Sequence, residues 1–341
     1  MESNVVPISG DIVAKTPCKR FSSVEMCAGG GGQALGLEEA GFDHLALVEL
    51  DKHSCKTLKD NRPKWNVVPG DLRDFDGTPY EGTDLLAGGL PCPPFSRAGK
   101  QLGEQDERNL FPTAKKLIEQ IKPRAVMIEN VRGILDAVFE DYRQSFVGMD
   151  ALKEYTCSWK LLNASDFGVP QLRPRVVFVA IRNEYADYFH WPTEDDYQEA
   201  PTVGDKLYDL ISSSGWRGAK QWRKLASEIA PTIVGGSLKH GGPDLGPTRA
   251  KRQWATLGVD GLGIANAAPE KNYVGMPRLT VRMVARLQGF PDNWNFSGGK
   301  TASYRQIGNA FPPPVARAVA SKIYSALLAG ELALSRRDLA S

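Results

Sequence analysis

The chain has 341 residues, of which 42% are hydrophobic and 24% charged, a balance typical of soluble globular proteins. Its length favours one large domain with a smaller one beside it. The net charge is only +2, but residues 200–278 contain eleven Lys and Arg against six Asp and Glu, so this segment carries +5 and the rest −3. A basic segment on a mildly acidic body predicts a local surface for a polyanion.

Several classes of protein are disfavoured by the composition. The five cysteines, at positions 18, 27, 55, 92 and 157, are odd in number and lack a CxxC pair, so neither a disulfide framework nor a zinc site is indicated. The apolar runs are too short for a membrane span, and the N-terminus lacks the pattern of a secretory signal. We expect residues 1–17 to be a flexible tail and the protein to act in a reducing cytoplasm.

The first half of the chain alternates short apolar runs with amphipathic stretches. We predict strands over residues 21–26, 45–50, 84–87, 125–128 and 176–181, and helices over 32–40, 52–61 and 110–121. This alternation indicates an α/β fold with a parallel sheet and helices on both faces.

The pattern changes after about residue 183. Residues 200–278 contain twelve glycines and no clear period, which indicates a small irregular domain, and a last helix is predicted over 313–329. We expect a catalytic domain formed by residues 18–185 and 290–335, on which the last helix packs, and a second domain over 186–289.

Residues 25–36 form a glycine-rich segment between a predicted strand and a predicted helix. Gly29, Gly31 and Ala34 fit a G-x-G-x-x-A spacing, in which glycines let the backbone turn tightly and approach a ligand at the helix N-terminus. Taken alone, such a turn can serve packing only. With a strand before it and an acid 20 residues after Gly29, it indicates a site for an adenosine-containing cofactor.

Three acids indicate how this cofactor is held. Glu49 ends the next strand, where a carboxylate accepts ribose hydroxyls, and Asp71 follows the third strand, within reach of an adenine amino group. The spacing does not distinguish a nicotinamide dinucleotide from S-adenosylmethionine. Glu25 favours the latter, because a carboxylate at the strand end repels a pyrophosphate but suits a sulfonium and an amino group.

Residues 90–96 read Leu-Pro-Cys-Pro-Pro-Phe-Ser and directly follow a predicted strand. Open α/β sheets bind their ligands at the carboxyl ends of their strands. The prolines around Cys92 fix the backbone and remove amide donors. A structural cysteine usually lies inside an element among apolar residues, so we interpret Cys92 as a nucleophile.

Glu129 ends the strand at 125–128, so it is expected to face the same crevice, although a lone acid there is also typical of a helix cap. Arg173 and Arg175 open the next strand, where alternation places them on one face. Taken alone, such a pair is usually a solvated edge. The combination with Cys92 is more specific than its members.

Methylation of C5 of cytosine needs these groups together. A thiolate adds at C6, a buried acid protonates or hydrogen-bonds N3, and an arginine holds O2, after which C5 can accept a methyl group. A base then removes the C5 proton and the thiolate leaves by elimination. Cys92, Glu129 and Arg175 supply the first three roles, provided that burial raises the pKa of Glu129 and nearby cationic charge keeps Cys92 reactive.

These residues closely resemble the motifs of the DNA (cytosine-5) methyltransferase family, of the bacterial restriction–modification type. The motifs occur in the family's order at residues 25–32, 49, 71, 91–92, 129–131, 171–175, 278–291 and 306–310. The resemblance covers about residues 20–183 and 278–328. It implies a Rossmann-like S-adenosylmethionine-dependent methyltransferase sheet with a second, smaller, irregular target-recognition domain.

The resemblance assigns three groups of residues. The catalytic set is Cys92, Glu129, Arg173 and Arg175, and Asn130 supports the Pro91-Cys92 loop. The cofactor contacts are Glu25, Met26, Cys27, Ala28, Gly29, Gly31, Gly32, Glu49, Leu50, Asp71, Leu72, Gly89, Pro91, Leu110, Asn309 and Ala310. The DNA contacts are Ser96, Arg97, Lys100, Thr232, Lys239, Arg249 and Arg252.

The resemblance also implies double-stranded DNA as the substrate, because a base inside a duplex must be flipped out to react. Recognition of a short specific sequence is expected from the basic domain. The expected enzyme is a monomer with S-adenosylmethionine as its cofactor and no metal. A paired restriction endonuclease would act on the same DNA site without binding it.

Three other interpretations stay open. An RNA methyltransferase of the transfer-RNA type shares most motifs, but it carries a Cys-Phe-Thr signature before its last motifs, and this chain has no cysteine after Cys157. A non-catalytic DNA-binding relative would not need both Cys92 and Glu129. A nicotinamide dehydrogenase explains the glycine segment but neither residues 90–96 nor the Arg-x-Arg pair.

Overall fold

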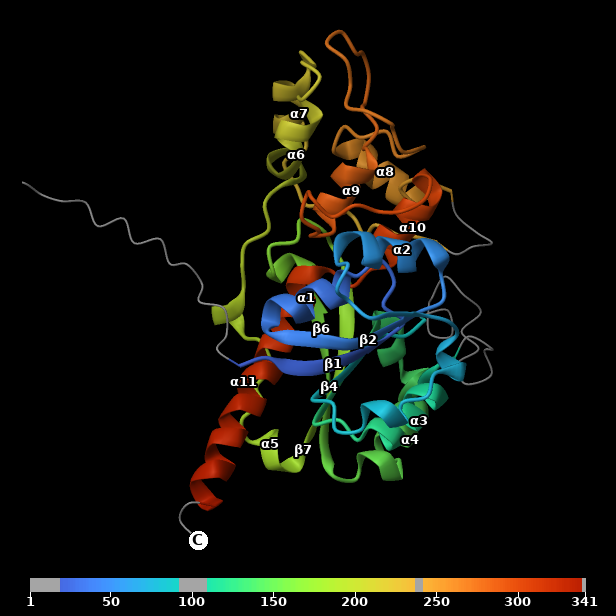
Figure 1. The fold of residues 1–341 in the computed structure, drawn as a ribbon. Coiled ribbons are helices and arrows are strands. Elements are labelled where there is room, and N and C mark those ends of the chain that lie inside the picture. Colours follow the sequence, from blue (N-terminus) through green and yellow to red (C-terminus); the bar gives the residue numbers. More distant parts are fainter. Residues whose placement is uncertain (1–18, 92–108, 237–241, 339–341) are drawn as a thin grey trace, which may run out of the picture.

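The computed structural model describes residues 19–91, 109–236 and 242–338 (Figure 1). Within these residues, seven strands form one sheet in the order β3-β2-β1-β4-β5-β7-β6. The strands are β1 (Phe21–Met26), β2 (Phe42–Glu49), β3 (Val67–Pro69), β4 (Leu85–Gly89), β5 (Ala125–Val131), β6 (Tyr155–Asn163) and β7 (Pro174–Arg182). The predicted α/β fold is confirmed.

The sheet is not entirely parallel, so that part of the prediction was wrong. Strands β1 to β5 pair in parallel, but β7 lies between β5 and β6 and runs antiparallel to both. Residues 164–173 link β6 to β7, a connection too short for the crossover that parallel neighbours need. As a result, the first residues of β7 lie at the edge where the parallel strands end. Strand β6 was not predicted, since it is largely solvent-accessible and lacks an apolar run.

Helices cover both faces of the sheet (Figure 1). The helices are α1 (Gly32–Ala40), α2 (Lys52–Asn61), α3 (Phe111–Ile121), α4 (Glu140–Val147), α5 (Asn183–Ala186), α6 (Val203–Ile211), α7 (Ala219–Leu225), α8 (Thr248–Thr256), α9 (Val281–Leu287), α10 (Lys300–Asn309) and α11 (Pro313–Asp338). One core lies between the sheet and α3 and α4, and another between the sheet and α1 and α11. Among the described helices, none combines the length and apolar character needed to cross a bilayer.

The region after residue 200 is more regular than predicted, because it contains α6, α7 and α8. Helix α6 begins at the cap Thr202 and buries Val203, Leu207 and Ile211, which recur every four residues on one face. The many glycines of the surrounding loops conceal this short period. These helices share one core with α9, α10 and Trp294, so the expected domain boundary at 289–290 falls inside that core.

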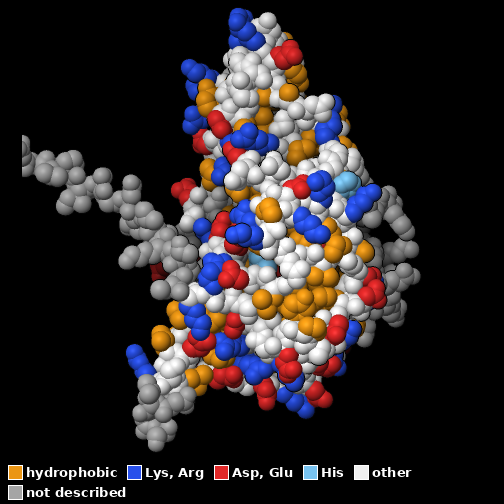
Figure 2. Space-filling model, viewed as in Figure 1, with side chains coloured by type: hydrophobic (Ala, Val, Ile, Leu, Met, Phe, Trp, Pro, Cys, Tyr) orange, Lys and Arg blue, Asp and Glu red, His pale blue; other side chains and the backbone are white. Residues whose placement is uncertain are grey.

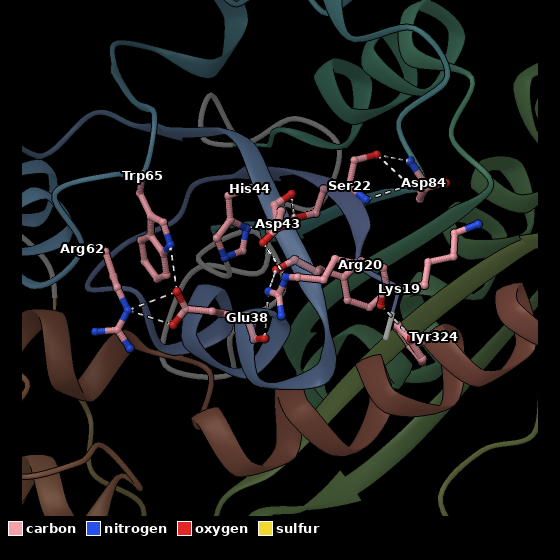
Figure 3. A network of polar contacts seen from close by, with 12 residues as sticks. Lys19, Arg20, Ser22, Glu38, Asp43, His44, Arg62, Trp65, Asp84 and Tyr324 are labelled. Carbon is pink, nitrogen blue, oxygen red and sulfur yellow. Dashed lines mark hydrogen bonds and ion pairs between the residues drawn. The ribbon is translucent and has the colours of Figure 1, made fainter. Parts of the chain in front are cut away.

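A half-buried histidine, His44, joins α1 to the sheet (Figure 3). The Nε2 atom of His44 in β2 lies 3.0 Å from the carbonyl oxygen of Ala34, and Nδ1 lies 2.9 Å from Oγ of Ser23. A carbonyl can only accept, so Nε2 carries the proton and Nδ1 accepts from the Ser23 hydroxyl. The rings of Trp65 and His44 pack at an interplanar angle of 83°, and the Trp65 Nε1 donates to Glu38 at 3.2 Å. The fold therefore holds His44 in its neutral form.

We expect the free energy of unfolding to fall by about 3 kcal/mol between neutral pH and pH 4 because of His44 alone. Burial lowers the pKa of His44 from 6.5 to about 4. Below pH 6.5 the unfolded chain therefore binds a proton at His44, whereas the folded chain does not until about pH 4. The stability that His44 contributes above pH 6.5 is lost as the pH falls. Urea unfolding of the wild type and His44→Gln between pH 4 and 8 measures this. Parallel pH curves for the two proteins would contradict it.

Candidate active site

The glycine segment turns tightly between β1 and α1. Gly29 and Gly31 have φ values of 54° and 87°, in the left-handed region that glycine adopts without strain. A Cβ atom on Gly31 would lie 2.7 Å from the Trp294 ring and 2.8 Å from Leu58. Trp294 Nε1 also donates to the carbonyl oxygen of Gly30 at 3.0 Å. The turn is thus fixed by its own glycines and by a tryptophan that the sequence analysis did not assign.

Two carboxylates lie at this turn. Glu49, at the end of β2, accepts hydrogen bonds from the backbone N–H of Gly29 at 2.6 Å and of Asp51 at 2.7 Å. Glu25, near the end of β1, is buried, and its Oε2 atom has no hydrogen-bond partner. Burial and the negative charge of Glu49 raise the pKa of Glu25 well above its ordinary value. A cation placed beside Glu25 would satisfy this oxygen and favour its ionised form.

The other expected cofactor residues differ in their exposure and in their hydrogen-bond partners. Asp71 accepts from the backbone N–H of Arg73 at 2.9 Å and pairs with its guanidinium at 2.9 Å. Leu50 is 71% exposed and Asn309 is also exposed, at the end of α10, where its Nδ2 donates to the carbonyl oxygen of Gly236. Of the remaining expected contacts, Met26, Ala28, Gly31, Gly32, Leu72, Leu110 and Ala310 are buried, and Cys27, Gly29, Gly89 and Pro91 are half-buried.

Glu129 and Arg175 form an ion pair beside the carboxyl ends of β4 and β5. Arg175 Nε lies 2.7 Å from Glu129 Oε1, and the two side chains are only 12% and 9% exposed. Burial raises the pKa of Glu129, although the charge of Arg175 opposes the shift. The reversed direction of β7 makes this pair possible, because Arg175 pairs with Val131 in the register between β7 and β5. The structure thus brings together an acid with a raised pKa and a guanidinium at one end of the sheet.

Gly89, three residues before Cys92, pairs with Glu129 in the register between β4 and β5. Asn130 Nδ2 contacts the carbonyl oxygen of Leu90 at 3.4 Å, the position from which a support of the loop was expected. Cys92 itself lies outside the described residues. Of the cysteines that are described, Cys27, Cys55 and Cys157 all have their pKa raised by burial, the last two to about 11. None of these three is suited to act as a thiolate at neutral pH.

Arg173 is placed differently from Arg175. It is fully buried, and its Nη1 and Nη2 atoms donate to the main-chain carbonyl oxygens of Ile233 at 2.6 Å, Gly308 at 2.7 Å and Ala310 at 2.9 Å. The Arg-x-Arg pair therefore does not act as one unit, since Arg175 contacts Glu129 whereas Arg173 holds segments distant in the sequence. The alternation of a strand could not have revealed this, because the accepting carbonyls come from other parts of the chain.

The expected DNA contacts are only partly described. Arg249 and Arg252 are exposed one turn apart on α8, whereas Lys251 between them pairs with Asp244 at 2.8 Å. Thr232 donates from its hydroxyl to the carbonyl oxygen of Leu172. Figure 2 shows Lys and Arg side chains spread over the upper part of the molecule, which α6 to α10 form. Ser96, Arg97, Lys100 and Lys239 lie outside the described residues.

Comparisons with known proteins agree with this geometry. The chain matches the C-5 cytosine-specific DNA methylase family over residues 21–325. It is 54% identical over 313 residues to the Type II methyltransferase M.NgoMIV of Neisseria gonorrhoeae, covering 90% of this chain and 98% of the relative. It is 56% identical over 313 residues to the Type II methyltransferase M.NaeI of Lentzea aerocolonigenes, covering 89% of this chain and 75% of the relative.

Solved structures show the same fold at low identity. The methyltransferase EhMeth of Entamoeba histolytica has a TM-score of 0.63 at 14% identity, covering 91% of this chain and 99% of that one. The Dnmt2 methyltransferase of S. pombe has a TM-score of 0.57 at 18% identity, with coverage of 91% and 99%. These two likenesses concern the fold, whereas the family match extends over most of the sequence. The chain belongs to the C-5 cytosine-specific DNA methylase family.

Proposed function

We propose that the protein flips a cytosine out of duplex DNA and methylates its C5 atom within a specific short sequence, as the modification enzyme of a restriction–modification system. The observation that carries the proposal is the buried Glu129–Arg175 pair, 2.7 Å apart, beside the loop that leads to Cys92. In this proposal Cys92 adds to C6 of the base, Glu129 donates to N3 and Arg175 holds O2.

The residues at the glycine turn fit S-adenosylmethionine. The unpartnered Glu25 oxygen suits its cationic groups, and both Glu49 oxygens keep a lone pair for the ribose hydroxyls. When bound, S-adenosylmethionine supplies an electrophilic methyl group on its sulfonium. Gly29 and Gly31 let the main chain approach it, and Asp71 and Leu110 are proposed to contact its adenine.

Residues of the basic region are proposed to hold the DNA. Arg249 and Arg252 are exposed on α8 and, among the described residues, neither forms an ion pair such as that of Lys251 with Asp244, which leaves them available to phosphates or base edges. Thr232 and Lys239 are proposed to contact the same duplex. The names of the two curated relatives as Type II methyltransferases support the restriction–modification role.

Tritiated S-adenosylmethionine tests the proposal on duplex plasmid DNA and on transfer RNA in parallel. We expect DNA to take up at least roughly 100-fold more label than transfer RNA, because a specific nucleic-acid site exceeds a non-specific one by 10³-fold or more. Bisulfite sequencing of the labelled DNA should then show conversion-resistant cytosines at one position of one short motif.

The same assay separates the other interpretations. Label in transfer RNA alone would support the RNA methyltransferase and overturn the proposal. Binding to DNA without any incorporation would support a non-catalytic relative. A Glu119→Gln control, which changes an exposed acid of α3, should methylate as the wild type does.

A further inference from the structure

Four segments that are distant in the sequence meet at a buried polar junction. The side chains of Gln171, Arg173 and Gln288 are all fully buried there. They contact the main chain at Ile233, in residues 231–236 of the expected target-recognition domain (the recognition segment), and at Gly308 and Ala310, at the end of α10. A buried network in which each member has partners specifies one arrangement of its segments.

Arg173 is the centre of the junction. Its two terminal nitrogens donate to three carbonyl oxygens, those of Ile233, Gly308 and Ala310, between 2.6 and 2.9 Å. A planar guanidinium presents these donors in a fixed fork, whereas a lysine offers a single nitrogen on a flexible stem. Lysine at this position would keep the charge but lose the simultaneous contacts.

The two glutamines complete the network. Gln171 accepts from the backbone N–H of Ile233 at 2.8 Å and donates to Gln288 Oε1 at 2.8 Å. Gln288 donates in turn to the carbonyl oxygen of Ala310 at 2.7 Å. Ile233 and Ala310 are therefore joined by two routes, one through Arg173 and one through Gln171 and Gln288.

Beside the junction, the main chains at Gly235 and Gly308 pass very close to each other. A Cβ atom on Gly308 would lie 2.4 Å from the backbone nitrogen of Gly235, and one on Gly235 would lie 2.5 Å from Asn309 Oδ1. Only glycine permits the two main chains to approach so closely. A side chain at either position would therefore push the segment 231–236 away from the end of α10.

The junction lies between a residue expected to hold the cytosine and a residue expected to contact the DNA. Arg175, which pairs with Glu129, follows Arg173 by two positions, and Thr232, an expected DNA contact, directly precedes Ile233. We propose that Arg173 is a positioning residue that fixes the recognition segment 231–236 relative to the base pocket, so that reading of the DNA site and capture of the cytosine depend on each other. This inference rests on the proposed function.

Arg173→Lys tests the inference, with Arg143→Lys as the matched control. Arg143 is also a buried arginine that donates to main-chain carbonyls, those of Ile134 and Asp136, but it lies away from the recognition region. Each enzyme methylates the same plasmid to equal total incorporation, and bisulfite sequencing then gives the share of methylation outside the wild-type motif. We expect Arg173→Lys to raise that share roughly tenfold, as loss of a typical coupling between sites would.

The control distinguishes positioning from mere support of the fold. If Arg173 has only a structural role, both lysine variants should give less active enzyme and lower thermal stability but should methylate the same sequence motif as the wild type. That result would overturn the inference. If Arg173→Lys does not fold, Gln288→Asn, which shortens one arm of the junction, should relax the motif in the same direction, and an unchanged motif again overturns the inference. A wild type that methylates no DNA would instead refute the proposed function.

Discussion

Replacing Glu129 by glutamine is expected to lower the rate of methyl transfer by roughly 10³-fold while leaving DNA binding close to that of the wild type. Glutamine keeps the size of the side chain and an oxygen that accepts from Arg175, but it cannot give a proton to N3 of the base. The 2.7 Å contact with Arg175 should therefore persist, and the loss should fall on the chemical step. Single-turnover methylation and a DNA-binding titration of the same preparation measure the two quantities.

The pH dependence gives this prediction a second readout. Burial raises the pKa of Glu129, and the protonated form is the donor in the proposed mechanism, so the wild-type rate should fall as the pH rises through that pKa. The variant should lack this alkaline decline. A Glu129→Gln enzyme with wild-type rate and an unchanged pH profile would remove Glu129 from the mechanism.

Replacing Cys92 by serine is expected to lower methyl transfer by roughly 10⁴-fold or more, because a serine hydroxyl is a far weaker nucleophile than a thiolate. Duplex DNA containing 5-fluorocytosine provides a direct probe. Fluorine replaces the proton at C5 that must leave before elimination, so the wild type should remain covalently attached to this DNA on a denaturing gel. The serine variant should form no such complex.

The other cysteines supply the control for this experiment. Cys157→Ser changes a half-buried thiol in β6 whose pKa is raised to about 11, and it should trap 5-fluorocytosine DNA as the wild type does. Trapping by Cys92→Ser, or its loss in Cys157→Ser, would assign the nucleophile elsewhere.

The features that the sequence predicted well depend on local geometry. The glycine turn, Glu49 and Glu129 are all fixed by their distance from the end of a strand, and the structure places them at one edge of the sheet. The strand at 21–26 and the helices at 32–40 and 52–61 have the predicted bounds, because apolar period and capping glycine are local signals too.

The features that the sequence could not predict depend on distant partners. Arg175 reaches Glu129 only because β7 is inserted between β5 and β6 in the reverse direction, which no pattern within residues 171–182 reveals. The different task of Arg173 depends on carbonyl oxygens of residues 233, 308 and 310. The helices α6 to α8 were missed because they are short and lie among glycine-rich loops, and α8 buries only Trp254.

The late position of α11 in the chain affects how the protein folds during its synthesis on the ribosome. Val315, Val319 and Ile323 of α11 cover the face of the sheet that contains Phe21, Leu85 and Val179. Within the described residues, β7 is the last strand along the chain and ends at Arg182, whereas α11 begins only at Pro313. At ordinary rates of translation, synthesis of the residues between β7 and α11 takes on the order of ten seconds, and this apolar face stays uncovered by α11 during that time. During that interval the nascent chain exposes an apolar surface that is prone to aggregation. We therefore expect the yield of folded protein in cells to depend on chaperones that bind this surface.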